Sequence, residues 1–329
     1  MVPGFAKVEA PLGGKTGNRE VSMHSRREFL RQVIAALGGV GLAGAQFRGL
    51  SWLLGTRPAD AAQTDLVWVE GRDPYANTVK ALAVLGGMGR FVKPGQNVAL
   101  LPNVGWARTP EQAGCTNPRV VRAVIDEAFK AGAKSVTAFS NPCNDARVSL
   151  DMSGIGKEIE QTNARYEFIN KKGWVRRPAV QGCTHIKRAD VYRLVQDSDV
   201  LISIPIAKHH GSSILTMCCK NLMGAVRDRG YIHQSLHEGI ADLTMMIPTT
   251  LCVLDATRIL VRNGPSSGNL NDVVVKNTLI AGVNPLHIDA LGTTLFGKQP
   301  SDIAHLKILA SRGFGTIDLA KIKYQTAKA

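Results

Sequence analysis

Short apolar runs alternate with helical stretches from residue 66 onwards, and this alternation restricts the possible folds more than any other feature. Runs such as 97–102 (NVALLP) and 200–204 (VLISI) have the length and the Val, Ile and Leu content of buried strands. The helix expected over 118–132 begins with Pro118, carries its apolar side chains on one face and ends at Gly132. Strands that alternate with helices form βαβ units with parallel strands. The sequence therefore predicts an α/β fold, a mainly parallel sheet flanked by helices.

The same pattern extends to the end of the chain. We expect strands over 66–70, 135–140, 166–169, 251–255 and 273–281, and helices over 74–90, 146–161, 215–226, 233–246, 286–296 and 303–311. The basic, irregular stretch 171–188 is expected to form a hairpin or an excursion from the sheet, and 205–213 a loop. We expect two closely packed α/β lobes, an N-terminal lobe over 62–198 and a C-terminal lobe over 199–329, which carries the Lys-, His- and Asp-rich site.

The segment ahead of these elements has the features of a removable export leader. Residues 25–31 (SRREFLR) resemble the twin-arginine signal, which is an address read by the Tat export machinery and not a membrane anchor. An apolar run over 33–54 and a small-x-small site at 59–61 follow it. We expect residues 1–61 to be removed, leaving a periplasmic or otherwise extracytoplasmic protein with no stable membrane span. Because this route carries folded proteins, often with a cofactor inserted, it favours a bound metal ion or redox group.

The chain is strongly basic, with 40 Lys and Arg against 26 Asp and Glu and a formal net charge of +14. Its positive residues are scattered, and only 5% of residues are aromatic. Proteins that bind single-stranded nucleic acid stack bases on aromatic side chains set among basic ones. We therefore expect no nucleic-acid partner, whereas a small anionic ligand or a redox partner remains open.

None of the six cysteines belongs to a C-x-x-C pair, which excludes a zinc ribbon and the usual ferredoxin ligand run. Cys143 and Cys218, or its neighbour Cys219, are candidate soft metal ligands. Disulfide bonds, free thiols and metal ligation all stay open at this stage.

The segment 205–213 follows the buried strand 200–204 directly and contains Lys208, His209 and His210. In open α/β sheets, ligands bind beyond the carboxyl ends of the strands. A lysine there supplies a compact cation, and a histidine supplies a proton-transfer group or a metal ligand. An ordinary polar loop is the alternative interpretation.

Other candidates follow further along the chain. On a helix, Thr216 and Lys220 share one face at i, i+4 spacing with Asn221 beside them, and could hold a phosphate or carboxylate; an ordinary surface lysine is the alternative. His233 and His237 have the i, i+4 spacing at which two helical imidazoles can share a metal, although exposed histidines are the commoner outcome. The candidate catalytic residues are thus Lys208, His209, Lys220, His233 and Asp255; the candidate cofactor-binding residues are Thr216, Asn221, Arg258 and Asp289; and the candidate metal ligands are His209, His233, Cys143 and Cys218.

Taken together, these motifs resemble the domain of unknown function 362 (DUF362) family, in its twin-arginine-exported branch. The resemblance covers about residues 65–320 and implies an α/β fold and, in some relatives, association with iron–sulfur modules; it implies no particular reaction. Cys218 and Cys219 depart from the small or apolar residues expected before Lys220. The residues that carry the resemblance are 116–118 (TNP), Cys143, 204–210 (IPIAKHH), Thr216, 220–224 (KNLMG), 229–233, 255–258 (DATR), Gly264, Pro265, Gly268 and Asp289.

Three functions fit these observations. The first is an exported protein that binds a metal or redox cofactor among the Lys, His, Asp and Cys candidates. The second is an enzyme that acts on an anionic small molecule held by Lys208 and Lys220, with His209 or His233 as acid or base. The third is a non-enzymatic binding or assembly factor for an exported redox complex. No P-loop, nucleophile elbow or dinucleotide-binding glycine motif is present in the sequence.

Overall fold

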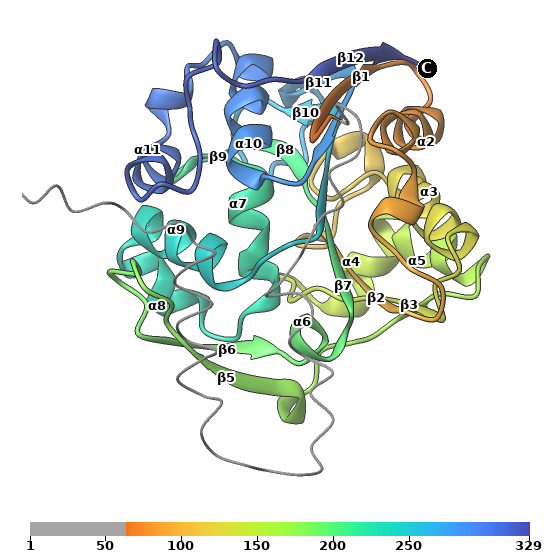
Figure 1. Ribbon diagram of the computed structural model, residues 1–329, viewed down its shortest axis with the longest axis horizontal. Helices are drawn as coiled ribbons and strands as arrows, with labels where there is room; N and C mark the ends of the chain where they lie inside the picture. Colours follow the sequence, from red (N-terminus) through yellow and green to blue (C-terminus); the bar gives the residue numbers. More distant parts are fainter. Residues whose placement is uncertain (1–63) are drawn as a thin grey trace, which may run out of the picture. The chain divides into compact units, whose positions relative to one another are not determined.

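A computed structural model describes residues 64–329 (Figure 1). The predicted leader over 1–61, with its twin-arginine motif and cleavage site, lies outside the described residues. Within 64–329, no helix combines the length and the apolar character needed to cross a bilayer.

A large mixed sheet, mostly of parallel strands, runs through the molecule, as the alternating pattern predicts. The strands follow the order β12-β1-β11-β10-β7-β2-β3-β4, and the run from β10 to β4 is parallel. Only β11 runs antiparallel to its neighbours β1 and β10 in this order. These strands are β1 (Leu66–Glu70), β2 (Asn97–Pro102), β3 (Ser135–Ala138), β4 (Arg165–Tyr166), β7 (Val200–Ile204), β10 (Leu251–Leu260), β11 (Val273–Gly282) and β12 (Gln325–Lys328).

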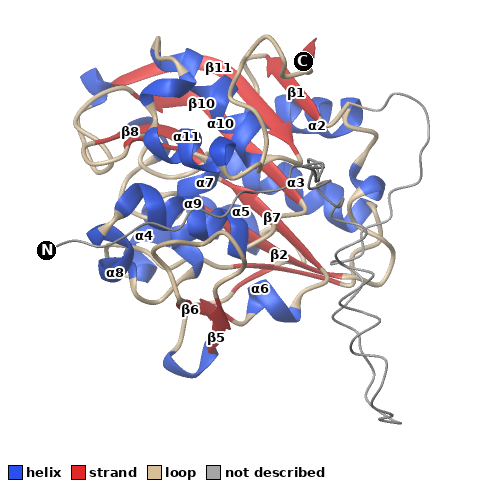
Figure 2. Cartoon of the chain, turned by 60° about the vertical axis from the view of Figure 1, so that its left-hand side comes forward, coloured by secondary structure: helices blue, strands red, loops and turns tan. Residues whose placement is uncertain are grey.

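Two layers of helices cover the two faces of this sheet, and each layer buries its own apolar core (Figures 1 and 2). One layer comes from the first half of the chain and includes Leu82 and Val124 in its core. The other comes from the second half and includes Ile240 and Leu306. The first layer comprises α2 (Pro74–Val84), α3 (Pro118–Lys130), α4 (Ala146–Met152) and α5 (Ile155–Glu160); the second comprises α7 (Cys218–Asn221), α9 (Leu236–Met246), α10 (Pro285–Thr293) and α11 (Ala304–Ser311).

The two predicted segments, 62–198 and 199–329, share this one sheet. Strand β7 of the second segment lies between β10 and β2, and β1 of the first segment pairs with both β11 and β12. The expected boundary at residue 198 therefore does not separate two sheets. The halves of the chain differ instead in which face of the common sheet their helices cover.

Several element boundaries differ from the expectation, and each difference has a local cause. The helix expected over 146–161 is divided into α4 and α5 at Gly154, which has a φ of 72°. The excursion 171–188 proves to be a hairpin of β5 (Trp174–Pro178) and β6 (Arg188–Tyr192), which lies apart from the main sheet in Figure 1. A short helix, α6 (Leu194–Asp197), leads from this hairpin into β7.

Three expectations near the candidate residues are wrong. The segment after β7 is a strand and not a loop: β8 (Ile206–His210) pairs with β10 and with β9 (Ile214–Thr216). The helix expected over 215–226 shrinks to α7 and a 3-10 turn over Leu222–Ala225, because residues 214–216 pair with β8. The helix expected over 233–246 is two helices, α8 (Arg229–Gln234) and α9, because Ser235 takes a non-helical φ of −140°.

Candidate functional site

The candidate residues gather where parallel strands β2, β3 and β7 end. The chain leaves β2 into a loop containing Asn103 and Gly114, leaves β3 towards Cys143, and leaves β7 into the β8–β9 hairpin. Helix α7 follows that hairpin and carries Lys220. The position is the carboxyl edge of the sheet, where open α/β proteins bind their ligands.

Lys208 is buried at the base of this region, with only 1% of its surface exposed. Its Nζ donates hydrogen bonds to Asn103 Oδ1 at 2.9 Å and to the carbonyl oxygen of Gly114 at 2.5 Å. Burial lowers the pKa of Lys208 to about 8. Two oxygen acceptors favour its protonated form, so Lys208 forms a fixed, buried cation.

Lys220 is also buried, with 7% of its surface exposed, but its surroundings are different. The contact of its Nζ is the thioether sulfur of Met223, at 3.2 Å, a weak acceptor. Burial, followed by the positive charge of Lys208, lowers the pKa of Lys220 to about 8, and Arg229 acts in the same direction. Among the salt bridges of residues 64–329, none joins a carboxylate to Lys208, Lys220 or Arg229.

Thr216 lies opposite Lys208 across the β8–β9 pair, so the two side chains project to the same face. Its side chain is 5% exposed, and its Oγ1 has no hydrogen-bond partner. A buried hydroxyl without a partner costs about 1–3 kcal/mol. A ligand oxygen beside Lys208 would remove this cost.

Buried hydrogen bonds hold helix α7, and with it Lys220, against the sheet. Asn221 Nδ2 donates to the carbonyl oxygen of Leu101 and to Ser203 Oγ, while Asn221 Oδ1 accepts from Asn103. At the start of the helix, the Asp289 carboxylate accepts the backbone N–H groups of Cys218 and Cys219 at 2.7 and 2.9 Å. Asn221 and Asp289 therefore act as supports of the lysine site.

Cys143 and Arg229 form the exposed side of the site. Arg229 Nη1 lies 3.2 Å from Cys143 Sγ and 2.9 Å from the carbonyl oxygen of Asn141, and Nη2 contacts the carbonyl oxygen of Pro142. Cys143 is exposed, whereas Arg229 is half-buried. We call Lys208, Thr216, Lys220, Arg229 and Cys143 the lysine cluster. It extends from a buried cation to an exposed thiol.

Three histidines near the lysine cluster, His210, His237 and His305, have lowered pKa values. Burial, with smaller effects of Lys220 and His233, lowers the pKa of His210 to about 3, so this imidazole is neutral at pH 7. His237 stacks on His305 with their Nδ1 atoms 3.2 Å apart. Burial lowers the pKa values of both, that of His305 to about 3, and Lys220 contributes in the same direction.

The residues predicted as metal ligands do not gather into one site. His233 lies on α8 and His237 on α9, so their i, i+4 spacing does not place them on one helix. His209 Nδ1 accepts the backbone N–H of Gly264, and Cys218 is fully buried at the start of α7. Within residues 64–329, no three or more His, Cys, Asp or Glu side chains are arranged to hold a metal ion. The donor set described here does not fit a metal or iron–sulfur centre.

Asp255 and Arg258 lie on β10 but take no part in the lysine cluster. The Asp255 carboxylate is buried and accepts hydrogen bonds from the backbone N–H groups of Asn117 and Thr257 and from Thr257 Oγ1. It therefore fastens the start of α3 to the sheet. Of the predicted site residues, the structure brings together Lys208, Thr216, Lys220 and Asn221, with Cys143 at the edge.

Sequence reasoning missed Asn103, Met223 and Arg229 as functional candidates. Asn103 directly follows β2, so the argument from strand ends applied to 205–213 would also have found it. Arg229 and Met223 were named only as part of the family motifs, and no sequence pattern places them beside a lysine. The absence of any ion pair to the two lysines, among the described residues, becomes visible only in three dimensions.

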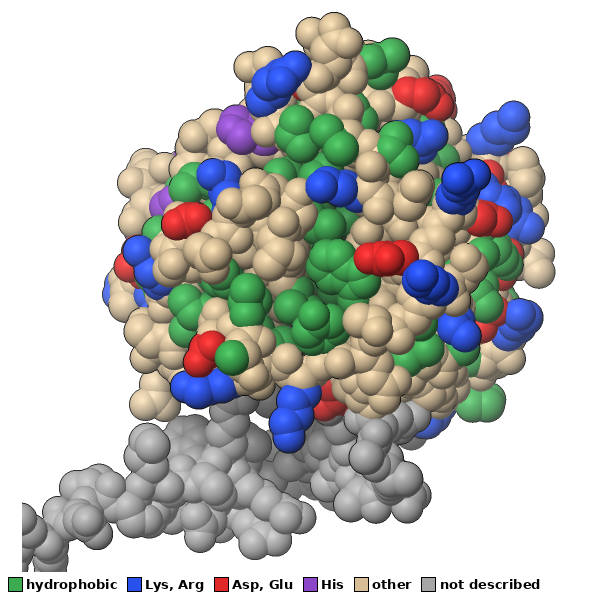
Figure 3. Space-filling model, turned by 90° about the horizontal axis from the view of Figure 1, so that it is seen from above, with side chains coloured by type: hydrophobic (Ala, Val, Ile, Leu, Met, Phe, Trp, Pro, Cys, Tyr) green, Lys and Arg blue, Asp and Glu red, His purple; other side chains and the backbone are tan. Residues whose placement is uncertain are grey.

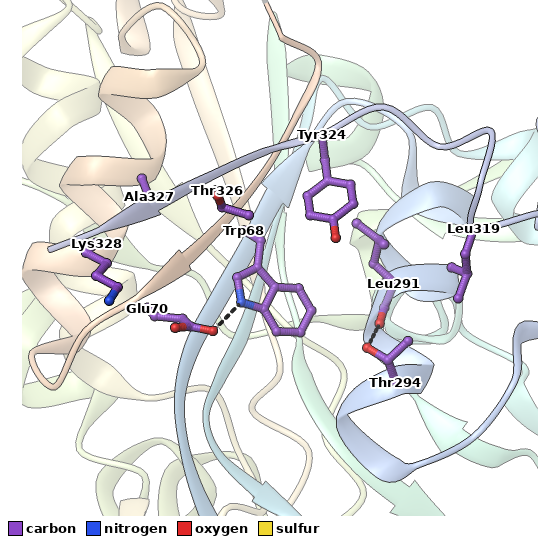
Figure 4. A pocket seen from close by; sticks show the side chains of 9 residues that line it. All are labelled: Trp68, Glu70, Leu291, Thr294, Leu319, Tyr324, Thr326, Ala327 and Lys328. Atoms are coloured by element: carbon purple, nitrogen blue, oxygen red, sulfur yellow. Dashed lines mark hydrogen bonds between the residues drawn. The ribbon is translucent and has the colours of Figure 1, made fainter.

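A separate pocket of about 660 Å³ lies at the β1–β12 edge of the sheet (Figure 4). Trp68 and Tyr324 point into it, and the charged side chains at its border are Glu70 and Lys328. None of the predicted site residues lines it. On the face shown in Figure 3, lysine and arginine side chains are dispersed among acidic and apolar ones.

The family match covers the whole lysine cluster. A family model described as "Domain of unknown function (DUF362)" matches residues 98–294. The thylakoid-associated protein sll1697 of Synechocystis sp. is 27% identical over 231 residues, which cover 68% of this chain and 70% of that protein.

Two solved structures share a distant likeness with the chain. One is a protein from Thermotoga maritima, with a TM-score of 0.45 and 11% identity over 69% of this chain. The other is the lactate racemase apoprotein from Thermoanaerobacterium thermosaccharolyticum, with a TM-score of 0.45 and 10% identity over 74% of this chain. The chain spans 60% and 56% of the lengths of these two proteins.

Proposed function

The chain belongs to the DUF362 family, and from this premise we propose that its lysine cluster binds an anionic small molecule through a phosphate or carboxylate group. The observation that carries the proposal is a pair of buried lysines, together with Arg229, that have no carboxylate partner in the described part of the chain. The matched family range, residues 98–294, includes every member of the cluster.

The cost of keeping these lysines charged supports an anionic ligand. A pKa lowered from 10.5 to about 8 means that the fold disfavours the charged form of each lysine by about 3 kcal/mol, through burial and, for Lys220, also through the charge of Lys208. Buried charges are normally paired, because an unpaired one loses its hydration without compensation. A bound anion would supply the missing opposite charge, and Thr216 Oγ1 would gain an acceptor.

We also propose that the protein acts outside the cytoplasm. The twin-arginine-like segment 25–31 supports this location, as does the relative named as thylakoid-associated. A role as a binding or assembly factor is compatible with both proposals, since such a factor can also bind an anion.

Thermal unfolding with and without anions tests the proposed ligand class. At a concentration of 100 times its Kd, inorganic phosphate or a small carboxylate should stabilise the protein by about 2.7 kcal/mol, a rise in Tm on the order of 5 °C. Lys220→Met should abolish the shift, because it removes one cation and preserves the apolar stem. The matched control is Lys80→Met, at an exposed position of α2.

Chloride at equal ionic strength separates specific binding from screening. The proposal fails when neither phosphate nor any carboxylate stabilises the wild-type protein, or when Lys80→Met and Lys220→Met reduce the shift equally. Turnover of a bound anion would identify an enzyme, and binding without turnover would support the binding factor.

A further inference from the structure

The two buried lysines have different hydrogen-bond environments, and the difference bears on their chemistry. Lys208 Nζ is held by two oxygen acceptors and is 1% exposed. Lys220 Nζ contacts only a thioether sulfur in the described structure and retains 7% exposure. Oxygen acceptors stabilise the ammonium form of a lysine, whereas a thioether sulfur is a weak acceptor and stabilises that form little. Lys220 is therefore the lysine of the pair suited to act as a neutral amine.

Burial and the neighbouring cations favour the neutral form of Lys220, whereas Cys143 acts in the opposite direction. Cations reach it from Lys208 on β8 and from Arg229 on α8. The remaining titratable neighbours are the thiol of Cys143 and the imidazoles of His210, His237 and His305, which come from the β3 exit, β8, α9 and α11. A desolvated lysine next to a second cation is a recognised form of activated amine nucleophile.

We propose that Lys220 forms an imine with the carbonyl group of a 2-oxo carboxylate. This inference rests on the proposed anion site and specifies its substrate class. Lys208 and Arg229 supply the positive charge for the carboxylate, and neither competes as a nucleophile, since one is held by oxygen acceptors and the other is a guanidinium. Thr216 Oγ1, buried without a partner, donates to a substrate oxygen.

Imine formation at Lys220 needs no reactant besides the amine and the carbonyl compound. The lone pair of neutral Lys220 Nζ attacks the carbonyl carbon, a C–N bond forms, and the C=O π electrons move to oxygen, which takes a proton. Loss of a second proton from nitrogen and departure of the oxygen as water then give the C=N bond. The overall change is one amine and one carbonyl converted to one imine and one water, with no oxidation or reduction.

Once formed, such an adduct opens a further reaction. A protonated imine withdraws electrons from the adjacent carbon, so that a bond there can break with its electron pair retained in the adduct. Enzymes that make or break carbon–carbon bonds next to a carbonyl use this property. The proposal thus places the protein among imine-forming enzymes of small oxo acids.

Reductive trapping tests the inference on the full-length protein. The protein is incubated with pyruvate or glyoxylate near pH 8, sodium borohydride is added, and the modified lysines are mapped by peptide mass spectrometry. We expect one saturable adduct on Lys220, with at least tenfold higher occupancy than on exposed Lys80, Lys157 or Lys276 in the same sample. Inorganic phosphate should compete with its formation.

Lys220→Arg separates this inference from the proposed function, because arginine keeps the positive charge but cannot form the imine. The Lys220→Arg protein should lose the adduct and retain phosphate binding. If arginine does not fit at this position, Lys220→Met reports the loss of the adduct. The wild-type protein still reports both phosphate binding and trapping. Phosphate binding by wild-type protein without a Lys220 adduct overturns the imine alone. No binding of phosphate or of any carboxylate overturns the proposed function as well.

Discussion

At the scale of single residues, the site depends on two buried lysines that have no carboxylate partner in the described part of the chain. The sequence placed Lys208 among the candidates because it follows a predicted strand, and Lys220 because it shares one face of a predicted helix with Thr216. It could not show that Lys208 has two oxygen acceptors or that Lys220 contacts Met223 Sδ. The contacts of Lys208 join residues 105 and 94 positions apart, which only the folded sheet brings together. Met223 lies three positions after Lys220, where α7 passes into the 3-10 turn.

The lowered lysine pKa values predict how anion affinity depends on pH. Each lysine must be protonated to attract an anion, and in the fold the protonated form is lost as the pH rises through about 8. Phosphate affinity should therefore be full near pH 7 and fall at least tenfold by pH 9.5, as titration calorimetry can measure. Lys220→Met should bind weakly at both values. An affinity that stays constant to pH 10 would contradict the pKa assignment.

At the scale of elements, tertiary pairing decided the structure where sequence patterns were ambiguous. Pro205 suggested that the strand at 200–204 ends in a loop, but β10 is ten residues long and extends past β7, so residues 206–210 pair with it as β8. Residues 214–216 then pair back as β9, although Ile214 has a φ of 66°, unfavourable for a β-branched residue. A helical apolar pattern cannot reveal an available strand edge elsewhere in the chain.

The support of α7 by Asp289 leads to a prediction at this scale. Asp289→Asn leaves one oxygen to serve the two N–H groups of Cys218 and Cys219 and turns an NH₂ towards one of them. We expect a loss of about 1–3 kcal/mol in the free energy of unfolding at pH 7 and a weaker affinity for phosphate. Denaturant titration and calorimetry measure the two effects.

Asp318→Asn is the matched control, since Asp318 is exposed and accepts the backbone N–H of Ala320. It should leave phosphate affinity unchanged. An Asp289→Asn protein with wild-type stability and wild-type phosphate affinity would show that α7 does not depend on this carboxylate.

At the scale of the whole molecule, the sequence predicted the individual strands better than their order in the sheet. The strands at 66–70, 97–102 and 200–204 begin and end where expected, because buried parallel strands appear as short uninterrupted apolar runs. Strand order depends on pairings such as that of β1 with β11, which lie about 210 positions apart in the chain. No local sequence pattern indicates such a pairing. The same limit explains why the sequence could not show that the candidate metal ligands form no metal-holding group within residues 64–329.

Crystallographic location of an anomalously scattering oxyanion tests the central claim, anion binding by the lysine cluster, most directly. Crystals of the protein grown near pH 7 would be soaked in selenate, a phosphate-like anion, at a wavelength near the selenium edge. We predict an ordered selenate with an oxygen about 2.7–3.2 Å from Lys220 Nζ and within hydrogen-bond reach of Thr216 Oγ1. Ordered selenate elsewhere on the molecule, with none at Lys208 and Lys220, would contradict the account.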